Sequence, residues 1–152
     1  VMLIDCISDL HGFKPQLLGG DILIVCGDLT ARNKRDEYHQ FNAWLSILPY
    51  RCKIVIGGNH DGLLERKQVM IGSEHVHYLC DSGFEFEGLK IWGSPYTPKF
   101  ENWHFMRNRG QDIRRHWDLI PNDTDIVVTH GPPYGILDEI DDNVHVGCKE
   151  LR

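Results

Sequence analysis

The stretch Ile22-Leu23-Ile24-Val25-Cys26-Gly27-Asp28 is an apolar run that ends in a glycine and a carboxylate. Runs that are apolar at nearly every position are typical of strands covered on both faces. Buried strands that carry oxygen and nitrogen ligands to one edge can build a site for two divalent metal ions. Three further segments end an apolar run in acid, amide or imidazole side chains: Ile7-Ser8-Asp9-Leu10-His11, Ile56-Gly57-Gly58-Asn59-His60-Asp61 and Val127-Val128-Thr129-His130-Gly131.

Strands and helices are expected to alternate over residues 1–152, which form a single domain large enough to bury a core. Strands are expected at residues 2–7, 22–26, 53–56, 76–79 and 125–129. Helices are expected at residues 34–48, 63–70 and 111–119, and a further helix is expected to begin at Gly147. Alternation from Phe84 to Trp92 on both sides of Glu87-Gly88 predicts a hairpin.

Composition narrows the function classes. The net charge of −6 argues against a nucleic-acid polymer as partner. No apolar run approaches the length of a membrane span, so no membrane partner is expected. Five cysteines without a Cys-x-x-Cys pair indicate buried thiols in a reducing compartment rather than a thiolate zinc site. The first strand begins too early for a signal peptide, which favours a cytoplasmic location.

The strand-end residues form a plausible ligand set. Asp9 and His11 lie two apart on an extended chain, so they share a face and could reach one ion. Asp28 could bridge two ions, while Asn59 offers an amide oxygen and His130 an imidazole nitrogen. Oxygen and nitrogen ligands without thiolate suit manganese, iron, zinc or magnesium.

Each of these residues also has an ordinary structural explanation. Asp9 could cap a helix, Asp28 could cap a turn before Thr30, Asn59 could belong to a simple turn, and His130 could be satisfied by the backbone. For a single residue the structural explanation is the better one. Four separate strand ends with ligand-type groups favour a metal site.

The order Asp-x-His, Gly-Asp, Gly-Asn-His-Asp and Thr-His-Gly-Pro-Pro resembles the calcineurin-like metallophosphoesterases. The segment Gly93-Ser94-Pro95-Tyr96-Thr97-Pro98 and the pair Arg109-Gly110 are similar to the metallophosphoesterase-domain-containing subgroup, which resembles class III cyclic-nucleotide phosphodiesterases. The resemblance implies an α/β fold, a sandwich of two mixed β-sheets flanked by helices. It also implies two divalent metal ions.

The resemblance assigns a role to each strand-end residue. His60 would face the substrate phosphate and protonate or stabilise the leaving oxygen, Asn59 would also contact the substrate, and Asp61 would orient His60. The implied metal ligands are Asp9 and His11 at the first ion, Asp28 at both ions, and Asn59 and His130 at the second.

One element of the resembled family is missing. The family carries Gly-His-x-His after the Thr-His-Gly-Pro-Pro strand, whereas this sequence reaches Arg152 without it. Neither His75-Val76-His77, which reads as a strand before the hairpin, nor His145, expected in a loop, is a good substitute. We therefore expect the last strands of the sandwich to be absent, either in a fragment or in a natural short form, with weakened metal binding. A second copy could cover the exposed sheet edge, giving a homodimer.

The expected reaction is hydrolysis of a small phosphodiester, with a cyclic nucleotide as the first candidate, by a hydroxide bridging the two ions. Residues 95–105 could form a wall on which a base stacks, with Arg107 and Arg109 near a second anionic group. Alternatively, these aromatic residues only cover the edge of the hairpin. The alternative function is a noncatalytic interaction module that keeps the fold. The Gly-Asp-x-x-Asp-Arg-Gly pattern of protein phosphatases is not present after Gly27.

Overall fold

The computed structural model describes residues 1–152 and contains a parallel sheet in the order β1-β2-β3-β4. Val25 lies opposite both Ile7 and Val55, so the carboxyl ends of the first three strands reach one edge together. Strands β1 and β4 are the outer strands of this sheet, and the predicted homodimer through a sheet edge stays a prediction. The strands are β1 (Ile4–Ile7), β2 (Gly20–Cys26), β3 (Tyr50–Ile56) and β4 (Val76–Tyr78).

A second sheet has the order β5-β6-β9 and is mixed. Its antiparallel pair turns at Glu87-Gly88, which confirms the predicted hairpin, and β9 is parallel to β6. The first sheet is parallel throughout, so the expectation of two mixed sheets is correct for the second sheet only. The strands are β5 (Ser82–Phe86), β6 (Leu89–Ser94) and β9 (Ile126–Thr129).

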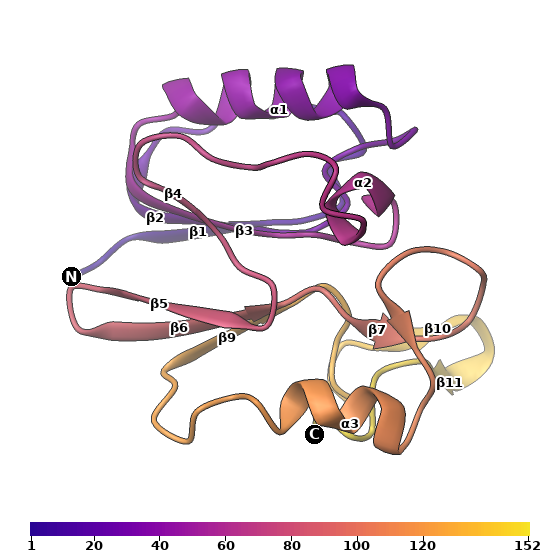
Figure 1. Cartoon of the computed structure of the whole chain (residues 1–152). Helices are drawn as coiled ribbons and strands as arrows, with labels where there is room; N and C mark the ends of the chain where they lie inside the picture. Colours follow the sequence, from indigo (N-terminus) through magenta and orange to yellow (C-terminus); the bar gives the residue numbers. More distant parts are fainter.

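The two sheets lie face to face between helices, as Figure 1 shows. Successive side chains of a strand point to opposite faces, so β2 contributes to two cores. Ile22 and Ile24 pack between the sheets, whereas Leu23 and Val25 pack beneath α1 (Arg35–Ile47). Burying both faces explains why β2 is apolar throughout. The predicted α/β sandwich flanked by helices is confirmed.

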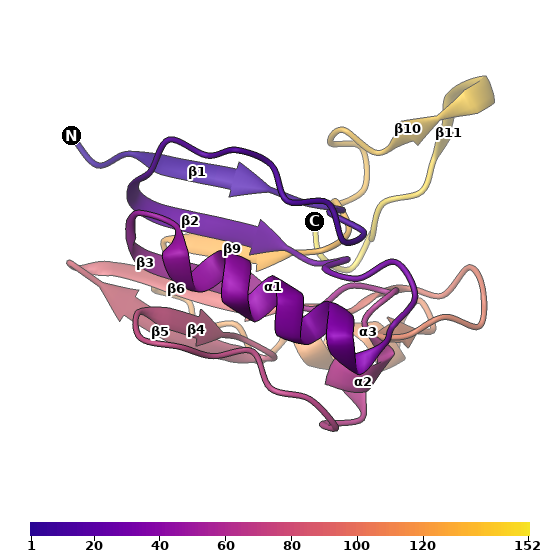
Figure 2. The same ribbon diagram turned by 90° about the horizontal axis from the view of Figure 1, so that it is seen from above.

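The remaining elements are short and lie mostly around the second sheet. Helix α3 lies on the side of this sheet away from α1 (Figure 1), and the β10–β11 hairpin projects from the body of the molecule (Figure 2). None of the helices is long and apolar enough to cross a bilayer. The elements are α2 (Gly62–Glu65), β7 (Thr97–Pro98), β8 (Met106–Arg107), α3 (Gln111–Trp117), β10 (Glu139–Ile140), the 3-10 turn η1 (Asp141–Asn143) and β11 (Val144–His145).

Three local predictions are wrong. No helix begins at Gly147, because Cys148 instead pairs with the Pro132-Pro133 turn through its backbone and packs its thiol side chain into a small apolar cluster. The helix expected at residues 63–70 ends at Glu65, and Lys67 follows with a φ of 55°, a left-handed conformation that cannot continue a helix. His145 belongs to strand β11 rather than to a loop.

The buried carboxylate of Asp138 holds the β10–β11 hairpin. It accepts hydrogen bonds from Nδ1 of His145 at 2.7 Å and from the backbone nitrogen of Gly147 at 2.9 Å. Burial alone would raise its pKa, but hydrogen bonds from the backbone of Gly135 and Gly147 and from His145 lower the pKa of Asp138 to about 2.

This lowered pKa predicts how acid affects stability. The unfolded chain binds the proton first as the pH falls, so the stabilisation from Asp138 is complete above its ordinary pKa of 3.8 and disappears toward pH 2. We expect Asp138→Asn to flatten the dependence of unfolding free energy on pH between 4 and about 2. Urea titrations at several pH values measure this slope, and an unchanged slope in the variant would contradict the assignment.

Candidate metal centre

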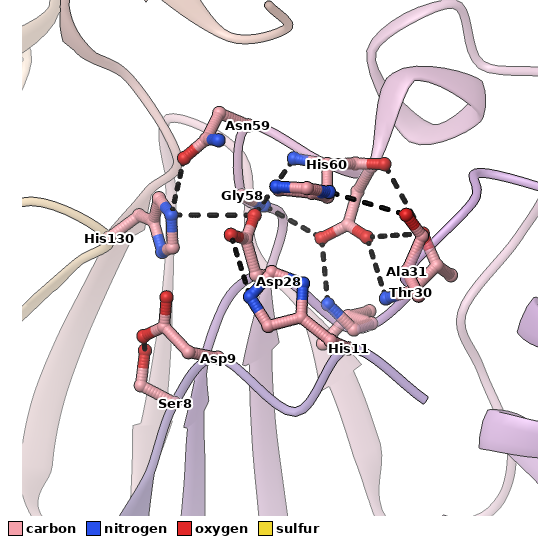
Figure 3. Close-up of polar contacts among 12 residues, drawn as sticks. Ser8, Asp9, His11, Asp28, Thr30, Ala31, Gly58, Asn59, His60 and His130 are labelled. Carbon is pink, nitrogen blue, oxygen red and sulfur yellow. Dashed lines mark hydrogen bonds and ion pairs between the residues drawn. The ribbon is translucent and has the colours of Figure 1, made fainter. Parts of the chain in front are cut away.

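The four strand-end motifs meet at one edge of the sandwich. β1, β2 and β3 bring their ends from the first sheet, and β9 brings its end from the second (Figure 3). The side chains form two groups, and both groups include Asp28. Within each group, the ligand atoms lie within 4.8 Å of one another. The groups are His11, Asp28 and His60, and Asp9, Asp28 and His130.

Asp28 is the centre of the cluster. Asp28 is only 3% exposed, and its backbone φ of 54° turns the chain sharply after Gly27. Oδ1 accepts a hydrogen bond from the backbone nitrogen of His60 at 2.8 Å and lies 3.4 Å from Nε2 of His130, while Oδ2 lies 3.6 Å from Nε2 of His11. The two oxygens therefore face different histidines, as a carboxylate shared between two cations requires.

The charge of Asp28 is favoured by its surroundings. Burial raises its pKa, but the hydrogen bond and charge of His130 and the backbone N–H of His60 outweigh burial and lower the pKa. The carboxylate is therefore ionised at neutral pH, which is the state that binds a metal.

His130 and Asn59 offer two further acceptor atoms. Nδ1 of His130 lies 2.7 Å from the carbonyl oxygen of Cys26, which can only accept, so Nδ1 carries the proton. Nε2 then points its free position at Oδ1 of Asn59, 2.8 Å away, and at Oδ1 of Asp28. Three acceptors that converge on one point need a cation or an extra proton between them. This donor set fits a divalent ion.

The acceptor atoms around Nε2 also change the pKa of His130. Burial lowers its pKa, but the hydrogen bond and charge of Asp28 outweigh burial and raise the pKa. A proton on Nε2 thus stabilises the cluster when no metal is bound, and a metal would replace that proton.

Asp9 and His11 are held by the loop that carries Asp28. The backbone nitrogen of Asp9 donates to the carbonyl of Gly27 at 3.1 Å, and that of His11 donates to the carbonyl of Asp28 at 2.9 Å. Both residues have a positive φ, 55° and 46° respectively, an uncommon conformation that the paired loops maintain. No helix follows β1, so the capping explanation for Asp9 is wrong.

Their backbone is not extended, so the alternation that should place Asp9 and His11 on one face does not apply. The structure places Asp9 with His130 and His11 with His60, each next to Asp28. That Asp9 and His11 bind the same ion therefore rests on the family resemblance and stays a prediction.

His60 belongs to the group with His11 and Asp28, and its ring lies between two other rings. Its imidazole meets His11 edge-on at a centroid distance of 4.5 Å and Trp103 at 4.3 Å. Nδ1 is 3.4 Å from the carbonyl oxygen of Ala31. A pocket of about 300 Å³ begins at His60 and Asn59. His60 can thus face either the cluster or the pocket.

Asp61 does not orient His60, which corrects the expectation. Its fully buried carboxylate accepts hydrogen bonds from the backbone nitrogens of Gly58, Leu29 and Thr30 and from the Thr30 hydroxyl, at 2.9–3.1 Å. Asp61 therefore fastens the loop that follows β2 to the loop that follows β3. The motif marked Asp61 as important, but no signal in the sequence identified Leu29 and Thr30 as its partners.

The two arginines expected near the substrate are used elsewhere. Arg107 lies over the ring of Tyr96 at 4.4 Å and donates from Nε to Nε2 of His116 at 3.2 Å. Arg109 donates to the carbonyl oxygens of Val146 and Gly147 and so holds the C-terminal segment. Neither arginine lines the pocket beside His60.

Comparison with known proteins agrees with this geometry. The model of the calcineurin-like phosphoesterase family matches residues 2–150. Metallophosphoesterase domain-containing protein 1 of Homo sapiens is 36% identical over 174 residues, covering 96% of this chain and 53% of the human protein. A UPF0046 protein of Caenorhabditis elegans is 38% identical, covering 96% of this chain and 60% of its own length.

A third relative has a different name. Probable rhamnogalacturonate lyase C of Emericella nidulans is 40% identical over 161 residues, which cover 97% of this chain but 15% of the fungal protein. The chain spans about half the length of the human relative and a small part of the fungal one.

Proposed function

Because the chain belongs to the calcineurin-like phosphoesterase family, we propose that it is a metal-dependent hydrolase that cleaves a small phosphodiester. The observation that carries the proposal is the position of Asp28, whose two carboxylate oxygens face two separate groups of ligand atoms. A cyclic nucleotide is the first candidate substrate, and this choice rests on the resemblance to the phosphodiesterase subgroup. The lyase name has little bearing, since that match covers 15% of the fungal protein.

In the proposed mechanism, two ions would be held by Asp9, His11, Asp28, Asn59 and His130. Such ions supply activation of water and neutralisation of charge on the phosphate. Asp28 positions His60 through the backbone hydrogen bond of 2.8 Å, and the Ala31 carbonyl fixes the Nδ1 proton on its ring. As general acid, His60 gives a proton from Nε2 to the leaving alcohol.

Two further expectations belong to this proposal. All five cysteines are free thiols, which supports a reducing compartment such as the cytoplasm. A homodimer paired through an outer strand would protect an exposed sheet edge. Analytical ultracentrifugation tests the second point, and a monomer at all concentrations would contradict it.

Hydrolysis of bis(p-nitrophenyl) phosphate by protein first stripped with a chelator and then supplied with Mn²⁺, Fe²⁺, Zn²⁺ or Mg²⁺ tests the activity. We expect no turnover after stripping and restored turnover with at least one metal. Elemental analysis of the same samples is essential. A sample that binds metal yet hydrolyses the ester no faster than buffer would favour the noncatalytic module.

His60→Ala is expected to lower turnover by roughly 100-fold or more, the usual effect of losing a general acid. Metal content should stay near that of the wild type, because His60 is proposed to act on the leaving group rather than to bind an ion. His39→Ala, an exposed substitution on α1, is the control and should change neither quantity. Parallel loss of metal and activity in His60→Ala would mean that His60 is a ligand.

A further inference from the structure

The pocket that begins at His60 is built by three loops, and Asp28 is not among the residues that line it. It has a volume of about 300 Å³, at the lower end of the range for small-molecule sites. No carboxylate lines it. The loop after β2 contributes Ala31, Arg32 and Asn33, the loop after β3 contributes Asn59 and His60, and the loop between β7 and β8 contributes Asn102, Trp103 and His104.

Three of these side chains have no polar partner within the chain. The Arg32 guanidinium, the Asn102 amide and the Trp103 indole nitrogen make no hydrogen bond or ion pair. By contrast, the amide oxygen of Asn33 accepts from the Tyr38 hydroxyl and the backbone of Leu63, both at 2.7 Å. These unused groups belong to exposed residues that line the pocket, so they remain available to a ligand.

Trp103 gives the pocket its aromatic surface. The residue is 44% exposed although it packs edge-on against His60, with an interplanar angle of 79°. A large, partly exposed aromatic ring that lines a polar pocket offers a π-face on which a flat ring can stack. Because the same ring touches His60, a group stacked there lies next to the proposed proton donor.

We propose that this pocket holds the leaving alcohol of the phosphodiester, and that Trp103 selects alcohols that carry a flat aromatic ring such as a nucleobase. The inference rests on the proposed function, since it uses His60 as the residue nearest the leaving oxygen. In hydrolysis, water forms the new bond to phosphorus, the bond to the leaving oxygen breaks, and His60 supplies the proton to that oxygen. Arg32 and Asn102 contact polar substituents of the ring or sugar.

Stacking of one base commonly changes affinity by about 10-fold to 100-fold. Calorimetric titration of the manganese-loaded protein with adenosine 5′-monophosphate and with ribose 5-phosphate isolates this contribution, because both ligands carry the same sugar phosphate. We expect the nucleotide to bind at least about 10-fold more tightly. Trp103→Ala should remove the preference, whereas Trp103→Phe, which keeps a π-face, should largely retain it.

Controls separate this inference from the proposed function. Trp44→Phe, a change on α1 outside the pocket, should leave the preference unchanged. Titration with p-nitrophenyl phosphate shows whether the pocket accepts any aromatic alcohol or only nucleosides. Binding as tight as that of the nucleotide indicates a site for any aromatic alcohol, and weaker binding indicates a nucleoside site. Equal affinity of the wild type for the nucleotide and ribose 5-phosphate, or an unchanged preference in Trp103→Ala, would overturn the inference. Hydrolysis of bis(p-nitrophenyl) phosphate by the same sample would leave the proposed function standing.

Discussion

Asp61→Asn is expected to destabilise the protein by about 3 kcal/mol, although it changes a single oxygen to an NH₂ group. Oδ2 of Asp61 faces two backbone N–H groups, and Oδ1 faces another N–H group and the Thr30 hydroxyl. Whichever way the asparagine amide turns, its NH₂ group meets at least one backbone N–H group and leaves that donor without an acceptor, whereas the Thr30 hydroxyl can still donate to the carbonyl oxygen of His60. Each buried donor left unsatisfied costs roughly 1–3 kcal/mol.

This destabilisation should be local to the metal centre. The donors belong to Leu29, Thr30 and Gly58, which lie within one or two residues of Asp28 and Asn59. We therefore expect Asp61→Asn to lower both the urea midpoint and the metal content. Asp118→Asn, which changes an exposed aspartate at the end of α3, is the matched control and should leave both near wild type. Wild-type stability in Asp61→Asn would show that other contacts hold the loops together.

Most of the sandwich could be predicted from the sequence because its strands follow simple periodic patterns. The near-continuous apolar run of β2 indicates burial on both faces of the strand. The break in the alternating pattern at Glu87-Gly88 indicates a hairpin turn. The helix expected at residues 34–48 agrees with α1 to within one residue at each end, and Tyr38, Phe41 and Leu45 form its buried stripe. These signals are local, since each depends on the neighbours of a residue in the chain.

The errors occur where distant contacts override local preference. Residues 147–152 resemble the start of a helix, yet backbone pairing of Cys148 with Pro132 decides their conformation. In the sequence, Arg107 and Arg109 resemble cations that are free to bind a substrate. In the structure, Arg107 contacts Tyr96 and His116, and Arg109 donates hydrogen bonds to two backbone carbonyls. Such partners lie far away in the chain, so no local pattern identifies them.

The centre itself was only partly predictable for the same reason. That strand ends would meet followed from parallel strands in a shared register. The grouping of Asp9 apart from His11 did not follow, because it depends on left-handed conformations at Asp9, His11 and Asp28. Aspartate and histidine adopt that conformation more often than most other residues, but still in a minority of cases, and here hydrogen bonds between the loops impose it.

Gly58→Ala is expected to abolish the proposed metal-dependent activity by adding one methyl group. A Cβ atom at this position would lie within 3.0 Å of the backbone nitrogen and Oδ1 of Asp28, and 2.9 Å from Cε1 of His130. Real Cβ atoms do not approach other atoms so closely, and neither the buried carboxylate nor the backbone of Asp28 has room to withdraw. The substitution should therefore displace the carboxylate that both ligand groups share.

The loss should appear first in metal binding. Disturbing the surroundings of a ligand commonly costs 10–100-fold in affinity, and moving the shared ligand itself should cost more than about 100-fold. Gly72→Ala is the matched control, because a Cβ atom there meets nothing within 4 Å. Calorimetric titration with Mn²⁺ compares the two variants, and circular dichroism checks that each is folded. The added methyl group should move the carboxylate of Asp28 away from both groups of ligand atoms. If Gly58→Ala nevertheless bound manganese as tightly as Gly72→Ala, Asp28 would not be the ligand that two ions share.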